Sequence, residues 1–261
     1  SFLKPYDGGG WRGVSQVKDL ESLKQAYDES GSDLMHLQQA VAGFDVFVRA
    51  VGIGPQVRVM KYDPSQPLHE RYRVDRAFVD DDARQLIEDT CLTINTFFGW
   101  DFNSCEMLRR DGVFYPIDFA NPCPDNQVNS IHYHWPWYVI SNLKWAVFNA
   151  ATRRPMRKTL DFEPYYEIAK RDLPFRDKLA GYAAVARERL AAAEFAEFSD
   201  RHLGPLEEAA YAWFRSERCQ DAIRRKVAHL FPEDEVEEFT ARFLALVRES
   251  VDEMAGSGAV E

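Results

Sequence analysis

The sequence predicts an α+β fold in which a mixed, largely antiparallel sheet with helices is followed by an α-helical C-terminal domain. Before about residue 150, short runs of β-branched and aromatic residues alternate with turn residues, as in strands. After that point helix-forming residues dominate, and apolar residues recur at helical spacing. Asp111-Gly112, between two strand-like runs, is the strongest hairpin signal in the chain. We therefore expect a mixed domain over 1–150 and a helical domain over 151–261.

In the first part, the chain opens with a strand-like run that ends in a glycine cluster. Leu20, Leu23 and Tyr27 recur at helical spacing, which predicts a helix over 20–30, and a second helix is expected over 81–98. Further strands are expected over 44–51, 57–61, 106–108 and 113–119, with the last two forming the Asp-Gly hairpin.

The second part is predicted to be helical throughout. Pro174 precedes a long helical run to about residue 200, and Pro205 stands at a first-turn position that favours a new helix. The acidic residues after Pro232 are typical of a helix N-terminus. The expected helices cover 163–171, 175–200, 205–214, 220–230 and 233–251.

Composition excludes several classes of protein. With 46% hydrophobic residues the chain is not intrinsically disordered, and a formal net charge of -10 argues against non-specific nucleic-acid binding. No apolar run approaches the roughly 20 residues that span a bilayer. The four cysteines form no Cys-x-x-Cys pair, so we expect reduced, mostly buried thiols in a cytoplasmic protein. The abrupt start at Ser1, without Met, leads us to expect further residues upstream in a longer protein.

The first candidate motif is the segment from Leu3 to Val14, in which Lys4 precedes three consecutive glycines, Gly8, Gly9 and Gly10. Glycines without a Cβ let backbone N–H groups converge on an anion, and a preceding lysine adds a charge for phosphates. A flexible turn after an edge strand is the alternative. Because the lysine precedes the glycines, this is not a Walker loop, and no adjacent βαβ unit supports a dinucleotide fingerprint.

The second candidate motif combines Glu106 with Asp118 and Asn121 on the two sides of the Asp-Gly turn. Antiparallel pairing is expected to bring these side chains close together. Two carboxylates and an amide oxygen are hard ligands suited to Mg²⁺. The alternative is a surface hairpin with solvated acids, in which Asn-Pro only turns the chain.

Taken in order, the two motifs resemble those of the ATP-grasp superfamily. The stretch 34–45 (LMHLQQAVAGFD) is similar to the hinge segment of that family, and the resemblance covers about residues 3–125. Two positions depart from the family pattern. Gln38 stands where an acid is usual, and Asp118-Phe119-Ala120-Asn121 is one residue longer than Glu-x-Asn.

The resemblance implies a role for each matching residue. Lys4 and the loop containing Gly8, Gly9 and Gly10 would contact the ATP phosphates, which Lys61 would reach from the larger sheet. Gln38 and the backbone of Gln39 and Ala40 would contact the adenine, and Asp45 the ribose hydroxyls. Arg49 and Arg73 would clamp a carboxylate or phosphate. Glu106, Asp118 and Asn121 would hold the Mg²⁺, or Mn²⁺, that bridges the phosphates.

The resemblance also implies a reaction. ATP would phosphorylate a small-molecule or peptide carboxylate, and an amine or similar nucleophile would attack the acyl phosphate. Two alternatives remain open at this point: an ATP-grasp-derived kinase, and a non-catalytic nucleotide-binding regulatory module whose helical domain docks a partner. We expect neither a nucleic-acid nor a membrane partner, and the interpretation is compatible with a homo-oligomer.

Two further features have more than one interpretation. His132 and His134 would share one face of a strand and could hold zinc, although the neighbouring Trp135-Pro136-Trp137 favours a packed aromatic loop. The aromatic residues of the C-terminal helices could line a substrate pocket, but such stripes usually belong to the core.

Overall fold

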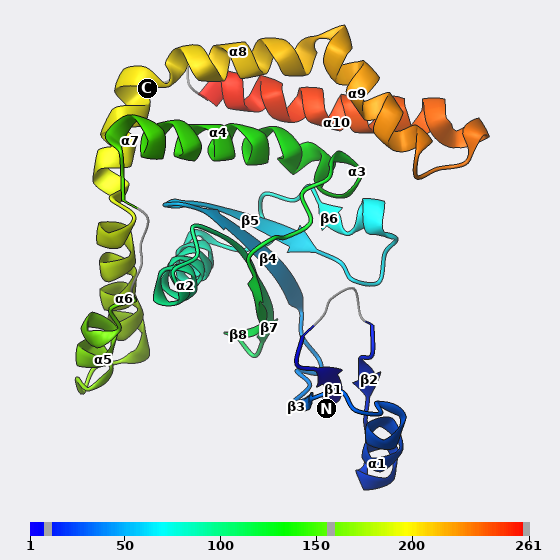
Figure 1. The fold of residues 1–261 in the computed structure, drawn as a ribbon, viewed down its shortest axis with the longest axis vertical. Coiled ribbons are helices and arrows are strands. Elements are labelled where there is room, and N and C mark those ends of the chain that lie inside the picture. The colour runs from blue at the N-terminus through cyan, green and yellow to red at the C-terminus, as the bar shows by residue number, and fades with distance from the viewer. Residues whose placement is uncertain (8–11, 156–159, 258–261) are drawn as a thin grey trace. The chain divides into compact units, whose positions relative to one another are not determined.

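The computed structural model describes residues 1–7, 12–155 and 160–257 and divides the chain into two compact units (Figure 1). The first unit comprises Ser1–Asp45 with Arg109–Tyr115, and the second comprises Val46–Leu108 with Pro116–Glu261. The tip of the Asp-Gly hairpin therefore belongs to the first unit. The boundary expected near residue 150 lies inside a helix, Trp135–Thr152.

The first unit contains a three-stranded antiparallel sheet with one helix among its described residues. Its central strand is β1 (Phe2–Pro5), with β2 (Ser15–Gln16) and β3 (Met35–Gln38) on either side. Helix α1 (Leu20–Glu29) begins at Asp19, whose carboxylate accepts a hydrogen bond from the Ser22 amide in a capping box. The strand expected at the N-terminus and the helix expected over 20–30 are both confirmed.

The second unit is built on a five-stranded sheet in the order β6-β5-β4-β7-β8. Strands β5 and β6 each pair antiparallel with the neighbour that precedes them, and Asp111 and Gly112 both have positive φ at the β7–β8 turn, as a two-residue hairpin turn requires. All four strands predicted in this region are confirmed. The bounds are β4 (Val46–Ile53), β5 (Gln56–Tyr62), β6 (Tyr72–Arg73), β7 (Phe102–Arg110) and β8 (Val113–Asn121), with a 3₁₀ turn, η1 (Leu68–Glu70), before β6.

Helix α2 (Asp81–Phe98) covers one face of this sheet, and its bounds are those predicted. Its N-cap, Asp80, accepts a hydrogen bond from the Ala83 amide, and Gly99 ends it in the left-handed conformation. A Cβ at Gly52 of β4 would meet Cys91 and Asn95 of α2. The even-numbered positions of β4 therefore face α2, and its odd-numbered positions face away.

The rest of the second unit is helical, which confirms the predicted change in secondary structure. One expected helix is divided: the run after Pro174 forms α6 and α7, because Ala191 adopts a left-handed φ of 50° between them. Sequence analysis did not assign α4. The bounds are α3 (Val128–Ile131), η2 (His132–His134), α4 (Trp135–Thr152), α5 (Glu163–Ala169), α6 (Phe175–Arg189), α7 (Ala192–His202), α8 (Gly204–Arg215), α9 (Glu217–Ala228), η3 (Glu233–Glu235) and α10 (Val236–Ser257).

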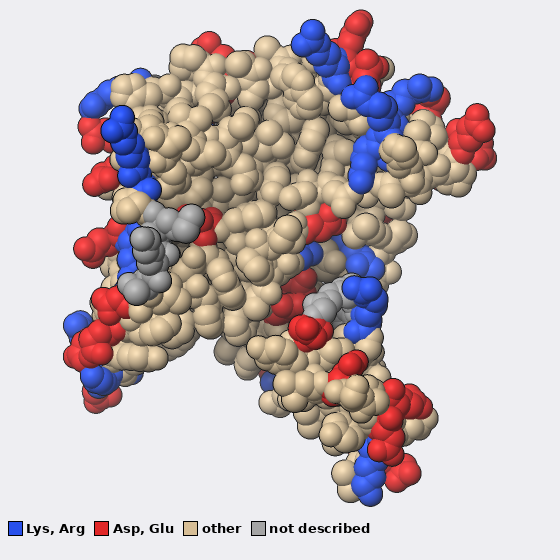
Figure 2. Space-filling model, in the orientation of Figure 1, with Lys and Arg blue, Asp and Glu red and all other residues tan. Residues whose placement is uncertain are grey.

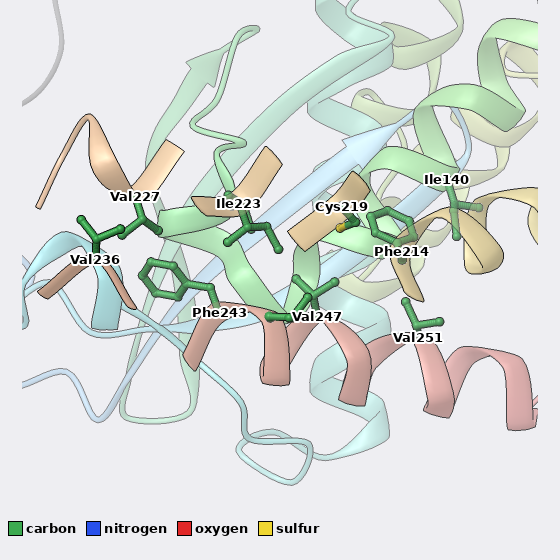
Figure 3. Packing of buried hydrophobic residues seen from close by; sticks show 11 residues of the cluster. Ile140, Phe214, Cys219, Ile223, Val227, Val236, Phe243, Val247 and Val251 are labelled. Atoms are coloured by element: carbon green, nitrogen blue, oxygen red, sulfur yellow. The ribbon is translucent and has the colours of Figure 1, made fainter. Parts of the chain in front are cut away.

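A large apolar cluster joins α9 and α10 to α4 (Figure 3). Ile223 and Val227 of α9 lie opposite Phe243 and Val247 of α10, and all four are fully buried. Burying a side chain of this size contributes about 2 kcal/mol, so the cluster holds α10 firmly in the second unit.

The surface seen in Figure 2 carries interleaved acidic and basic side chains, mostly near the edges of the view. Over α4 and α8 the same face has few charges. Within the described ranges, every helix falls short of the length or the apolarity that crossing a bilayer requires.

Candidate functional site

In the first unit, the structure places Lys4 and Gln38 on the same face of the small sheet. Lys4 of β1 lies opposite His36 of β3, and Phe2 lies opposite Gln38. Directly opposed residues of antiparallel strands share a face, as do residues two apart on one strand. The lysine and the amide predicted to contact ATP therefore lie on one surface, with Gln39 and Ala40 directly after β3.

Gly8, Gly9 and Gly10 lie outside the described residues, but the return of this loop is described at Gly13. Gly13 has a φ of +69°, and a Cβ placed there would lie 2.9 Å from the Pro5 side chain at the end of β1. Only glycine combines this backbone conformation with so close an approach. Gly13 therefore lies beside the end of β1.

Asp45, the predicted ribose ligand, is held by Arg109 within the first unit. The two guanidinium nitrogens Nε and Nη2 donate to the Asp45 carboxylate, the shortest bond being 2.6 Å from Nη2 to Oδ2. The Asp45 amide also donates to the Arg109 carbonyl at 3.0 Å. This bidentate contact orients a carboxylate that remains 59% exposed.

In the second unit, a polar cluster forms on the sheet face opposite α2. Arg49 of β4 lies 3.6 Å, through Nη1, from Glu106 Oε1 of β7, and its Nε and Nη2 donate to Ser104 Oγ at 3.4 and 3.3 Å. The side-chain amide of Asn121, at the end of β8, donates from Nδ2 to the same hydroxyl at 3.2 Å. We call Arg49, Ser104, Glu106 and Asn121 the Arg49 cluster. It brings together three of the predicted site residues.

Arg49 is nearly buried, and aromatic rings accompany its charge. Its guanidinium carbon lies 5.6 Å from the ring centre of Tyr62 and 5.8 Å from that of Tyr72. Burial alone would lower the pKa of Arg49, but Tyr72 and Glu106 raise it above its usual value. The site therefore holds a permanent cation beside a carboxylate that is only 20% exposed.

The third predicted metal ligand, Asp118, is exposed on β8, three residues before Asn121. Regular alternation would place the two side chains on opposite faces. The strand departs from alternation here. Phe119 and Asn121 are two residues apart and would share a face of a regular strand, but Phe119 stacks on Phe98 at the end of α2 and Asn121 contacts Ser104 on the other face. The Asn103 side chain bridges the irregular stretch: its Nδ2 donates to the Phe119 carbonyl, and its Oδ1 accepts from the backbone N–H of Asn121. The extra residue of the motif lies at this departure.

The remaining predicted cations, Lys61 and Arg73, do not join the Arg49 cluster through the sheet. Lys61 lies opposite Val48 on one side and Arg73 on the other, so its β5 position faces the α2 side, whereas Arg49 lies opposite Met60. The Lys61 ammonium pairs with Asp75 at 2.7 Å. Because Lys61 and Met60 are adjacent on β5, the Lys61 position faces the opposite side of the sheet from Arg49.

Sequence analysis missed Ser104 and Tyr72 as members of the site. Ser104 could have been found, because it precedes Glu106 by two residues and so must share its face of β7. No local signal marks Tyr72, which reaches Arg49 from a short strand formed by only two residues.

The histidine pair lies in the 3₁₀ turn η2 and not in a strand, so the geometry that motivated the zinc interpretation does not occur. Both side chains are buried, and His132 stacks on Phe243 of α10. The parts of the chain that the structure describes contain no group of three His, Cys, Asp or Glu residues able to hold a metal. The predicted ligands Glu106, Asp118 and Asn121 are not such a group, because Asn121 contributes an amide oxygen.

All four cysteines are free thiols. Cys91, Cys105 and Cys219 are buried and Cys123 is exposed, as the sequence led us to expect for most of them. Burial raises the pKa of Cys91 to about 12. A thiol of this kind is not a nucleophile at neutral pH.

Together, the fold and the site define a two-unit α+β protein with a nearly buried arginine–carboxylate cluster. No protein-family model matches the chain, and no curated protein matches it. Among solved structures the chain is similar to the D-alanine–D-alanine ligase of Helicobacter pylori, at 16% sequence identity and a TM-score of 0.41. The match covers 59% of this chain and 49% of the ligase, so the chain spans about half the length of that protein.

Proposed function

We propose that this chain belongs to an ATP-dependent ligase of the ATP-grasp kind, which joins a carboxylate to an amine through an acyl phosphate. The observation that carries the proposal is the Arg49 cluster. Arg49 and Asn121 both donate to the Ser104 hydroxyl, and Arg49 also pairs with Glu106, so Glu106 and Asn121 belong to one cluster although they lie on different strands. These are two of the three residues at which the motif resemblance places the metal ligands.

The donor set fits a hard divalent cation. Glu106, Asp118 and Asn121 offer carboxylate and amide oxygens, which Mg²⁺ and Mn²⁺ bind in preference to softer ligands. When bound, such an ion supplies charge neutralisation for the ATP phosphates. Arg49 pairs with the Glu106 carboxylate and orients it, so that the ligand is positioned before nucleotide arrives.

The first unit contributes the residues that would recognise the nucleotide. Lys4 supplies a cation for the phosphates together with the loop of Gly8, Gly9 and Gly10. Gln38, with the backbone of Gln39 and Ala40, would bind the adenine, and Asp45, oriented by Arg109, would accept hydrogen bonds from the ribose hydroxyls. Lys61 would bind the phosphates as a second cation, exchanging its Asp75 partner for a phosphate oxygen.

In this reaction the protein positions and neutralises charge, and no side-chain nucleophile is needed. A carboxylate substrate attacks the γ-phosphoryl group of ATP, and ADP leaves. The amine then attacks the acyl carbon, and inorganic phosphate leaves with the formation of an amide. Lys4, Lys61 and the cation at Glu106 would stabilise the charge on the transferring phosphoryl group.

Calorimetric titration of the full-length protein with ATP, with and without Mg²⁺, tests the proposal. We expect Mg²⁺-dependent ATP binding that Glu106→Gln weakens by at least about tenfold, because an amide is a poorer ligand than a carboxylate for a hard cation. Glu167→Gln is the matched control, since Glu167 is an exposed carboxylate on α5 that pairs with Lys170. Absence of ATP binding, or equal binding by Glu106→Gln and wild type, would contradict the proposal.

The product distinguishes the three activities considered for the sequence. A ligase forms an amide with ADP and phosphate, whereas a kinase leaves a stable phosphorylated product. Nucleotide binding without any ADP release in the presence of acid and amine would indicate a regulatory module.

A further inference from the structure

An open cleft of about 430 Å³ lies in the second unit. Its walls come from η1, β6, η2 and α10, and they include Tyr72, Arg73 and Arg242. A volume of this size accommodates a small molecule. The cleft depends on the C-terminal helix, and neither of the sequence motifs includes it.

The charged residues of the cleft leave an excess of one positive charge. Arg242 donates from Nη2 to Glu70 Oε1 at 2.9 Å, and a guanidinium carries five N–H donors. Arg73 is exposed, and its charge lowers the pKa of Glu70 in the cleft wall and that of Asp63 outside it. His132, also in the wall, is neutral, because burial and the nearby Arg242, His69 and Arg73 lower its pKa to about 4.

Tyr72 connects this cleft to the Arg49 cluster. The side chain lines the cleft, is 2% exposed, and its hydroxyl has no hydrogen-bond partner within the described parts of the chain. Its ring centre lies 5.8 Å from the Arg49 guanidinium carbon. Tyr72 is therefore a wall shared by the cleft and the Arg49 cluster, whereas its hydroxyl is closed off from the cleft.

We propose that this cleft binds the non-reacting carboxylate of a substrate, held by Arg73 and Arg242, with the reacting end directed past Tyr72 toward the Arg49 cluster. The inference rests on the proposed ligase function, since that function makes the ligand a substrate. The single excess positive charge matches a monocarboxylate, whereas Glu70 would repel the second charge of a phosphate dianion. Leu246 of α10 offers an apolar contact for the body of the acid.

Titration of the full-length protein with N-acetyl-L-leucine, without nucleotide, tests the inference. N-acetyl-L-leucinamide has the same shape without the carboxylate, and inorganic phosphate tests the alternative anion. We expect the acid to bind more tightly than either, and both Arg73→Gln and Arg242→Gln to weaken its binding by at least about tenfold, as expected for loss of a charged hydrogen bond. Arg248→Gln, an exposed arginine of α10 outside the cleft, is the matched control and should bind like wild type.

Three results would overturn the inference: no binding of the acid, binding of the amide or phosphate at least as tight as that of the acid, or unchanged binding by both cleft variants. A separate ATP titration of wild type keeps the two proposals distinct. Acid binding without ATP binding would overturn the ligase proposal, whereas ATP binding without acid binding would overturn only the assignment of the cleft.

Discussion

At the scale of single residues, charge burial explains the character of the site. Arg49 keeps its charge inside the sheet because Glu106, Ser104 and two tyrosine rings replace the water that it loses. Removing one member of such a group leaves the others buried without compensation. The cluster is therefore suited to holding a charged ligand in a defined position.

His132 carries a prediction about pH. Its folded-state pKa is about 4 against an ordinary value of 6.5, so below pH 6.5 the unfolded chain takes up a proton that the folded chain refuses. The stability contributed by neutral His132 is present above pH 6.5 and is lost as the pH falls toward 4. The loss is about 3 kcal/mol when complete.

Urea unfolding at pH 7 and pH 4.5 measures this effect. His132→Gln should lose distinctly less stability between the two pH values than wild type, because glutamine does not titrate. His229→Gln, an exposed histidine at the end of α9, should follow wild type. Equal losses in wild type and His132→Gln would show that His132 does not control this pH range.

At the scale of secondary-structure elements, turns and helix ends follow local chemistry, but their packing does not. Asp111-Gly112 forms the expected turn, and the Asp80 cap and Gly99 end α2 as local rules require. By contrast, the break at Ala191 has no glycine or proline to mark it. The surrounding helices must therefore impose the left-handed conformation there.

Two glycines with positive φ separate local strain from packing. Gly54, in the turn between β4 and β5, has a φ of +56° and faces the Trp145 ring of α4, which an added Cβ would overlap. Gly112 has a φ of +76°, but the space around it is open. We expect Gly112→Ala to cost about 1 kcal/mol through backbone strain, and Gly54→Ala about 3 kcal/mol through strain and overlap.

Chemical denaturation of the two variants measures both costs. Because the backbone strain is similar, the difference between them reports the contact of Trp145 with the turn. Equal destabilisation by the two substitutions would contradict that contact.

At the scale of the whole molecule, each compact unit carries residues with a role in the proposed function. Lys4 belongs to the first unit and Glu106 to the second. Lys4→Met should weaken ATP binding by at least about tenfold, since it removes a cation proposed to contact the phosphates. Lys18→Met, an exposed lysine of the same unit, provides the control. Calorimetry would contradict the prediction if both variants bound ATP equally well.

Much of the fold was predictable because it depends on neighbours in sequence. The runs of β-branched residues became β4 and β5, the Asp-Gly turn joined β7 to β8, and α2 appeared with the predicted bounds. Helix α4 was not predicted, because its aromatic and polar residues produce no clear apolar stripe. Its position depends on burial against other helices.

The sequence by itself determined the α+β class, the helical second part and the residue types of the candidate motifs, because periodicity and turn chemistry are local properties. Only the tertiary structure decided which of those residues meet. Strand pairing placed Arg49 with Glu106 and set Lys61 on the other face, since a single residue of offset reverses the direction of a side chain. It also placed Arg242 of the last helix and Arg73 in the walls of one cleft, although the two residues are too distant in sequence for any local pattern to bring them together.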